Sequence, residues 1–122
     1  MRVVRKKVQL LLLGGALLSG LWIGVTESWA LNPGDPVNGK KIYRAFCAGC
    51  HGLKGNGQGP AAAGTYPHPA NFTDPNFWKG KSDAFVINVI ENGYNAMPPW
   101  WDVITPQEVR DVFSYIKMFK KS

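Results

Sequence analysis

Cysteine and histidine are scarce in this chain, and their positions narrow the kinds of site it can form. The 122 residues include 2 cysteines and 2 histidines, and three of these four fall within Cys47-Ala48-Gly49-Cys50-His51. A zinc site needs four ligands, and beyond this motif the chain offers only His68, with no second C-x-x-C or H-x-x-x-H half. A disulfide between Cys47 and Cys50 is a competing interpretation, but it leaves His51 without a role.

Strand-like alternation and phosphate-binding signatures are also missing around the motif. No alternation of apolar and polar residues precedes Cys47, so the strand–helix context of a thioredoxin-type redox pair is absent. The next stretch, 52–64, is rich in glycine and has no apolar periodicity, which predicts a loop. It lacks a G-K-[ST] ending and a preceding strand, which argues against phosphate binding.

The spacing C-x-x-C-H is typical of covalent attachment of a c-type haem. Two thiols one helical turn apart can each add to a vinyl group of the same porphyrin, and the imidazole that follows can then bind iron. We therefore predict one covalent haem c attached through Cys47 and Cys50, with His51 as an iron ligand. A chain of this length has a small core, which a buried covalent haem would stabilise.

The N-terminus has the layout of an export signal. Four basic residues within 2–7 precede an uncharged run, 8–25, and small residues follow at Ser28 and Ala30. This pattern predicts a secretory signal peptide over residues 1–30, cleaved after Ala30. The uncharged run is also long enough to cross a bilayer, so an uncleaved membrane anchor is the competing interpretation. In both cases the basic end stays in the cytoplasm, which predicts a periplasmic location for the remainder.

The predicted mature domain, residues 31–122, is only weakly basic. Residues 1–30 hold four of the 14 basic residues and one of the 8 acidic ones, which leaves 10 minus 7, a formal net charge of +3. Two ionised haem propionates would lower it to about +1. This balance argues against nucleic acid or an anionic membrane as the main partner. We expect membrane association only if the N-terminal segment is retained.

Capping residues and apolar spacing predict three main helices, over residues 36–46, 83–92 and 106–120. The expected N-caps are Asp35, Ser82 and Thr105, the last in a capping box with Glu108, and Gly93 stops the second helix. The fold class is therefore all-α: three main helices and long loops wrapped around one covalently attached haem.

Two of these helices have recognisable packing faces. Gly39 and Tyr43 lie four residues apart, so Gly39 would let another helix approach closely while Tyr43 and Phe46 pack beside it. The last helix has an apolar stripe, which consists of Val109, Val112, Phe113, Ile116 and Phe119.

The segment between the motif and the second helix offers groups for the haem environment. The Pro60 carbonyl is free to fix the imidazole of His51 by a hydrogen bond. The stretch 66–74 is punctuated by prolines and is expected to be mostly extended. We expect three aromatic residues to wall one edge of the haem, namely Phe72, Phe77 and Trp78.

A six-coordinate haem needs a second axial ligand, and Met97 and Met118 are the sulfur candidates once Met1 is removed. Met118 falls on the polar side of the last helix, so its sulfur should point away from the core. Met97 is followed by Pro98 and Pro99, which stiffen the loop, and by two tryptophans, Trp100 and Trp101, which can shield the iron–sulfur bond. We predict Met97 as the ligand; His68 is the competing ligand, and a gap-filling core role for Met97 is the structural alternative.

From Gly34 to Phe119 the chain resembles the class I cytochrome c family, in its bacterial periplasmic form. The matching features are the helix before the C-x-x-C-H motif, Gly59-Pro60, Met97-Pro98 and the aromatic C-terminal helix, and the strings 71–74 and 95–100 are similar to those of periplasmic members.

The resemblance implies that the first and last helices cross closely, with Gly39 and Tyr43 against Phe113, Tyr115 or Ile116. It also implies that the Pro60 carbonyl accepts the His51 ring proton and that Met97 is the distal ligand. His68 departs from the pattern because it lies in a loop near the haem, where it leaves an alternate ligation state open.

The function predicted from these features is one-electron transfer by a periplasmic carrier. Its partners would be redox proteins, such as a dehydrogenase, a reductase or an oxidase, that dock transiently at the haem edge. Because a methionine-ligated iron has no open position, we do not expect an enzyme. The alternatives are a haem-containing subunit of a specific oxidoreductase complex, a haem enzyme, and a gas sensor in which Met97 or His68 exchanges with the gas.

Overall fold

The computed structural model describes residues 32–120, and the predicted signal peptide or anchor over residues 1–30 lies outside them. Within the described part the chain forms helices and loops without a strand. The elements are α2 (Pro36–Ile42), η1 (Tyr43–Cys47), α3 (Ala48–His51), η2 (Ala62–Gly64), α4 (Pro75–Trp78), α5 (Asp83–Asn92) and α6 (Pro106–Lys117). The predicted all-α fold class is confirmed.

The N-terminal helical segment is longer than the sequence indicated. The Asp35 side chain accepts a hydrogen bond from the Val37 N–H at 2.8 Å, as expected for the N-cap. The end predicted near Phe46 is wrong, because α2, η1 and α3 follow one another without a break up to His51. In η1 the helix widens to a π-helical turn, and the Ala48 N–H bonds the Tyr43 carbonyl five residues back. The wider turn carries the helix through the whole C-x-x-C-H motif.

The second predicted helix is confirmed as α5. The Ser82 hydroxyl accepts the Phe85 N–H at 3.1 Å, and Gly93 ends the helix with φ at 76°. That backbone conformation favours glycine. The site is also crowded, since a Cβ on Gly93 would lie 2.6 Å from the Met97 carbonyl oxygen. Gly93 therefore lets the chain fold back at once and bring Met97 against the end of α5.

The last predicted helix, α6, begins with the expected capping box. The Thr105 hydroxyl accepts the Glu108 N–H at 3.2 Å, and the Glu108 carboxylate accepts the Thr105 N–H at 2.7 Å. The helix ends at Lys117, so the end predicted near Lys120 is wrong. Beyond Lys117 the backbone N–H groups bond carbonyls three residues back, which tightens the chain into turns. Met118 is 67% exposed, as predicted from its position on the polar side.

Two short helical elements, η2 and α4, were not predicted. The α4 helix begins like α2: the Asp74 side chain accepts the Asn76 N–H at 2.8 Å, and Pro75 takes the first helical position. The pair Asp74-Pro75 therefore carried the same signal as Asp35-Pro36. The Trp78 indole then donates to the Phe72 carbonyl at 2.9 Å, which ties α4 to the extended segment before it.

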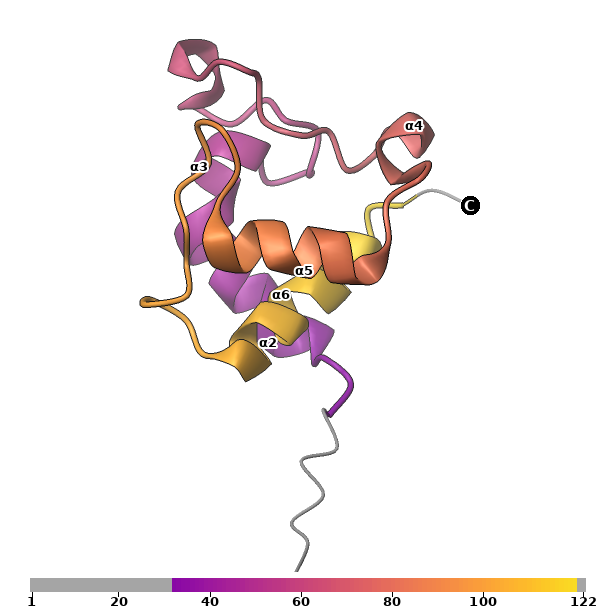
Figure 1. Cartoon of the computed structure of the whole chain (residues 1–122). Coiled ribbons are helices and arrows are strands. Elements are labelled where there is room, and N and C mark those ends of the chain that lie inside the picture. The colour runs from indigo at the N-terminus through magenta and orange to yellow at the C-terminus, as the bar shows by residue number, and fades with distance from the viewer. Residues whose placement is uncertain (1–31, 121–122) are drawn as a thin grey trace, which may run out of the picture. The chain divides into compact units, whose positions relative to one another are not determined.

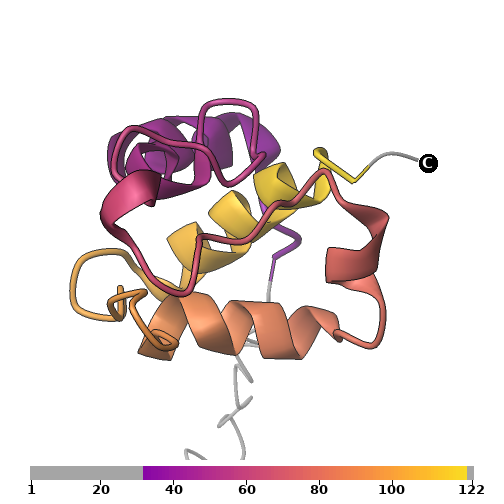
Figure 2. The same ribbon diagram turned by 90° about the horizontal axis from the view of Figure 1, so that it is seen from above.

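The close approach predicted for Gly39 is present where α2 crosses α6 (Figures 1 and 2). A Cβ on Gly39 would lie 2.0 Å from the Asp111 carbonyl oxygen. Tyr43 packs edge-to-face against Tyr115 with ring centroids 5.3 Å apart, one of the contacts the resemblance implied. The prediction that Phe46 also packs beside this close approach is wrong. Phe46 is half-exposed, and its ring lies 5.4 Å from that of Trp100.

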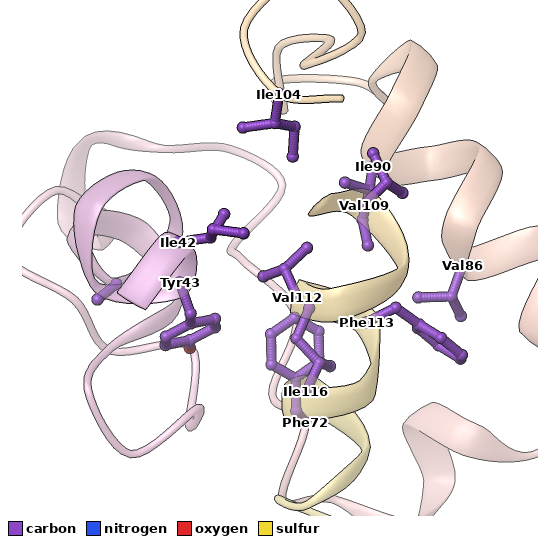
Figure 3. Packing of buried hydrophobic residues seen from close by; sticks show 11 residues of the cluster. Ile42, Tyr43, Phe72, Val86, Ile90, Ile104, Val109, Val112, Phe113 and Ile116 are labelled. Atoms are coloured by element: carbon purple, nitrogen blue, oxygen red, sulfur yellow. The ribbon is translucent and has the colours of Figure 1, made fainter. Parts of the chain in front are cut away.

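Helix α6 lies between the N-terminal helical segment and α5 and supplies the centre of the core. Figure 3 shows Ile42 and Tyr43 on one side of α6 and Val86 and Ile90 on the other. The predicted stripe of α6 is buried apart from Phe119, which is partly buried at its edge. The core consists of Ile42, Tyr43, Ala48, Phe72, Val86, Ile90, Ile104, Val109, Val112, Phe113 and Ile116.

One buried carboxylate joins α6 to the start of α2. Asp111 accepts the Asp35 N–H at 2.8 Å, the Asn38 amide at 2.8 Å and the Gln107 amide at 2.9 Å. Burial raises the pKa of Asp111, but these hydrogen bonds and the charge of Arg110 outweigh it, so the pKa lies below its usual value. The ionised side chain therefore anchors the N-terminus of α2 on α6.

Candidate functional site

A cavity of about 410 Å³ lies between the end of the N-terminal helical segment, the extended segment after η2, α5 and the loop after α5. All four predicted site residues line it: Cys47, Cys50, His51 and Met97. Its volume falls in the range of cofactor and small-ligand sites. Residues from two distant parts of the sequence are thus brought to one cavity.

The wall of the cavity is mainly apolar. Among the described residues its polar side chains other than the predicted site residues are Thr65, His68, Lys81, Tyr94 and Asn95, and no aspartate or glutamate lines it. The predicted aromatic wall is present in part, because Phe72 and Phe77 line the cavity, whereas Trp78 does not. Such a lining suits a large flat apolar ligand that carries a few polar groups.

The two thiols are placed by one turn of helix across η1 and α3. Both cysteines are free and partly buried, and both face the cavity. Burial raises the pKa of the Cys47 thiol to about 12, and the neighbouring Cys50 adds to the shift. Cys47 is therefore a protonated thiol at neutral pH and lacks the depressed pKa of a catalytic redox cysteine.

The imidazole of His51 is oriented by a backbone carbonyl and by a stacked aromatic ring. His51 is 9% exposed, and its Nδ1 lies 3.1 Å from the Ala70 carbonyl oxygen. Burial lowers the pKa of His51, and the contact with Ala70 offsets part of this, so the ring is neutral at pH 7. When Nδ1–H donates to Ala70, Nε2 keeps its lone pair for a metal. Phe72 stacks on the ring with centroids 4.6 Å apart, which fixes its plane.

The predicted hydrogen bond between the Pro60 carbonyl and the His51 ring is wrong, because the ring contacts the Ala70 carbonyl instead. The backbone beside Pro60 is bonded to the motif itself, since the Gly59 N–H donates to the Cys50 carbonyl and the Ala61 N–H to the Gly49 carbonyl, both at 2.9 Å. The chain returns to the imidazole only after η2, and there Ala70 presents its carbonyl to Nδ1.

Met97 lies in a loop whose two ends are held by backbone hydrogen bonds. Tyr94 and Met97 exchange two backbone hydrogen bonds, of 3.1 and 3.0 Å, and the Trp100 N–H donates to the Ile90 carbonyl at 3.2 Å. Trp100 lines the cavity as predicted. Trp101 is 66% exposed and does not line it, so the cover predicted from Trp101 is wrong.

His68, the competing ligand, lies on the wall of the same cavity between Pro67 and Pro69. Its side chain is exposed, as expected for a loop residue. Several lining residues were not predicted as part of the site, among them Lys81 and Val89. The helical spacing marked an apolar face of α5 but could not show that part of this face borders an open space.

The donor set fits a haem better than a bare metal ion. Among residues 32–120 no group of three or more histidine, cysteine, aspartate or glutamate side chains is placed to hold a metal. A porphyrin supplies four ligands by itself and asks the protein for at most two, which His51 and Met97 can provide from one apolar cavity. In the same part of the chain no helix has the length and apolar character needed to cross a membrane.

Comparison with known proteins points to the same kind of site. The family described as cytochrome C oxidase, cbb3-type, subunit III matches residues 34–116. Cytochrome c6 of Nostoc sp. is 31% identical over 113 residues, which cover 93% of this chain and 92% of that protein. The cbb3-type cytochrome c oxidase subunit FixP of Azorhizobium caulinodans is 33% identical over 88 residues, which cover 69% of this chain and 28% of FixP.

A solved structure agrees with this placement. The KustC0563 c-type cytochrome superposes with a TM-score of 0.58 and 30% sequence identity, covering 68% of this chain and 98% of that one. The family match, over residues 34–116, includes the C-x-x-C-H motif. On its sequence, its helical fold and its cavity, the chain belongs to the class I cytochrome c family, whose members carry covalently attached haem c.

Proposed function

We propose that this protein is a periplasmic one-electron carrier with a single haem c, attached through Cys47 and Cys50 and ligated by His51 and Met97. The observation that supports this most directly is the shared cavity, because two thiols, one neutral imidazole and one thioether reach the same apolar space. Relatives named cytochrome c6 and cytochrome c-553-like support a carrier role for a chain of this size.

Different cavity residues would have different roles in binding the haem. The thiols of Cys47 and Cys50 would tether the haem, the Ala70 carbonyl orients the His51 ring, and the hydrogen-bonded loop would supply the Met97 thioether as the second ligand. When bound, the haem iron supplies a one-electron couple whose reduction potential is raised by methionine ligation. Rigid ligands keep the geometry similar in both oxidation states, which favours fast electron transfer.

Electron transfer fits the cavity better than catalysis. An enzyme of this kind would need an open iron position with acid–base groups beside it. The cavity wall has no carboxylate among the described residues, and Met97, which lines the same cavity, would fill the second axial position. Cavity residues therefore exclude water and hold ligands, and no proton transfer is required of them.

The same proposal covers export and partners. Residues 1–30 would direct the chain to the periplasm, with cleavage after Ala30 or retention as an anchor. The partners would be redox proteins that dock weakly at the haem edge.

A second candidate is a haem subunit of one oxidoreductase complex rather than a free carrier. The specific observation is the family match to subunit III of cbb3-type oxidase, together with the relative FixP. Both uses need the same haem site. They differ in whether the purified chain elutes alone or with a partner from detergent-treated membranes.

The experiment that tests the ligation is carbon monoxide binding to the reduced protein. With Met97 on the iron, the wild type should bind the gas slowly or negligibly, because a ligand must first leave. Met97→Ala should bind it readily, and its reduction potential should fall because the sulfur ligand favours the ferrous state. The matched control is Met118→Ala, whose sulfur is exposed and outside the cavity, and which should behave as wild type.

Rapid binding of carbon monoxide to the wild type, or an unchanged absorption spectrum in Met97→Ala, would show that Met97 is not an iron ligand. The second axial ligand would then be His68, or the position would be open. Intact mass provides the check on attachment: a mature chain that lacks the added haem mass, when produced with a working maturation system, would contradict the proposal itself.

A further inference from the structure

The cavity has two different ends along α5, and only one of them is explained by haem attachment. Helix α5 lines one wall, with Phe85 toward its start and Ile90 toward its end. The Trp100 N–H bonds the Ile90 carbonyl at 3.2 Å, and the Trp100 ring packs 5.4 Å from that of Phe46, the neighbour of Cys47. The Ile90 end is therefore the end near the thiols.

Lys81 lies at the other end. It precedes α5 and lines the cavity beside Phe77. At about 1.5 Å per helical residue, it stands more than about 10 Å along the wall from Ile90. It is the one lysine or arginine among the described residues of the lining.

The ammonium group of Lys81 is held by two contacts with Phe77 and can still donate further hydrogen bonds. Its Nζ donates to the Phe77 carbonyl at 2.7 Å and lies 4.7 Å from the centroid of the Phe77 ring. An ammonium has three N–H donors, so two are left for other acceptors. Asp83, a carboxylate close by in the sequence, is engaged by Lys117 at 2.8 Å. Lys81 is itself exposed, so it presents its positive charge at the solvent-accessible edge of the apolar cavity.

A haem attached through Cys47 and Cys50 would bring negative charge to this end of the cavity. The two pyrroles that bear the thioether bonds lie on one side of the macrocycle, and the two that bear propionates lie on the opposite side. With the thiols near the Ile90 end, a haem attached to them would direct its propionates away from that end, toward the part of the cavity that Lys81 borders. A carboxylate in an apolar site is favourable only when it is paired or hydrogen-bonded.

We propose that Lys81 binds a haem propionate and thereby sets the charge beside the haem that tunes its reduction potential. The inference rests on the proposed attachment of one haem through Cys47 and Cys50. Lys81 acts as a positioning and tuning residue: it does not touch the iron, and it is outside the tether and the axial ligands.

The test measures the reduction potential as a function of pH in fully loaded protein for wild type, Lys81→Met, Lys81→Arg and Lys79→Met. A propionate has a higher pKa beside ferrous than beside ferric haem, so the potential falls with pH between the two values. An ammonium partner lowers both pKa values. Lys81→Met should therefore shift the pH range over which the potential falls upward by about one pH unit or more. At pH values above that range it should also lower the reduction potential. Lys81→Arg keeps the charge and should stay close to wild type.

Lys79→Met is the matched control, because Lys79 is an exposed lysine two residues away that does not line the cavity. It removes the same charge and should leave the pH region in place. An unchanged profile in Lys81→Met, or an equal shift in Lys79→Met, would overturn the proposal for Lys81. A wild-type chain without covalent haem would instead contradict the proposed function, so the two failures are distinguishable.

Discussion

The crossing of α2 and α6 and the cavity beside α5 are built from similar apolar residues but differ in how they are closed. At the crossing the backbones nearly touch, since a Cβ on Gly39 would lie 2.0 Å from the Asp111 carbonyl oxygen, and Tyr43 and Val112 are fully buried. At the cavity, side chains of the same character border about 410 Å³ of space.

This difference shows that the chain completes one part of its core by itself and leaves the other for a ligand. Protein interiors are normally close-packed, and an apolar space of this size forfeits many contacts. The crossing needs only residues of the chain, whereas the cavity side gains its remaining contacts from the haem we propose. Four substitutions, two of them with matched controls, would break or sharpen this distinction.

The largest effect is expected for Gly39→Ala. The new methyl group would overlap the α6 backbone, so the two helices must separate, and we expect a loss of about 3 kcal/mol or more in the free energy of unfolding. Denaturant unfolding of the haem-loaded protein measures it.

Gly64→Ala is the control for Gly39→Ala, because a Cβ at Gly64 has nothing within 4 Å. It should change the free energy of unfolding by less than about 0.5 kcal/mol. Equal stability of the two variants would mean that the close crossing is not required.

A smaller and more diagnostic effect is expected from two valines. Val112→Ala, at a fully buried position of α6, should cost about 2.5 kcal/mol in the free energy of unfolding and leave the haem absorption spectrum unchanged. Val89→Ala, on the cavity wall, should cost about 1 kcal/mol or less but shift the spectrum or the reduction potential, because water gains access to the haem. A spectral shift in Val112→Ala without one in Val89→Ala would invert the comparison.

A smaller effect than at Val112 is expected for Asp111→Asn, which should cost about 1.5 kcal/mol at pH 7 because an amide replaces an accepting carboxylate oxygen. The folded-state pKa of Asp111 is depressed, so its stabilising contribution is present above the unfolded pKa and is lost as pH falls through the folded pKa.

Thermal unfolding between pH 7 and pH 2 checks the Asp111 prediction. The acid loss of stability should be shallower in Asp111→Asn than in wild type, whereas Asp102→Asn, at an exposed aspartate, should keep the wild-type slope. An acid slope unaffected by Asp111→Asn would show that the carboxylate does not anchor α2 in its ionised form.

Much of the fold was predictable because its helices start and stop at local signals. Asp35, Ser82 and Thr105 cap helices in the structure, and Gly93 ends α5, as predicted. These groups satisfy backbone donors within a few residues of themselves, so the sequence alone contains both partners of each bond. The close approach at Gly39 was predicted from its position on the same helix face as Tyr43, although the backbone it meets, at Asp111, is distant in the sequence.

The wrong predictions concern partners that are distant in the sequence or a departure from α-helical geometry. The end of the first helix was misplaced because η1 widens into a π turn, which apolar spacing does not indicate. Pro60 was expected behind His51 because it follows the motif closely, but η2 intervenes and Ala70 returns to the ring.

The sequence by itself determined the chemistry: two thiols and an imidazole within five residues, and a stiff loop around Met97. Tertiary structure alone decided the environment of these groups, including the Ala70 carbonyl behind His51, the burial of Cys47, the exposure of Trp101 and the presence of Lys81 on the cavity wall. The physical reason is that reactivity and spacing are properties of neighbours along the chain. Burial, hydrogen-bond partners and local charge depend on segments that meet only when the chain is folded.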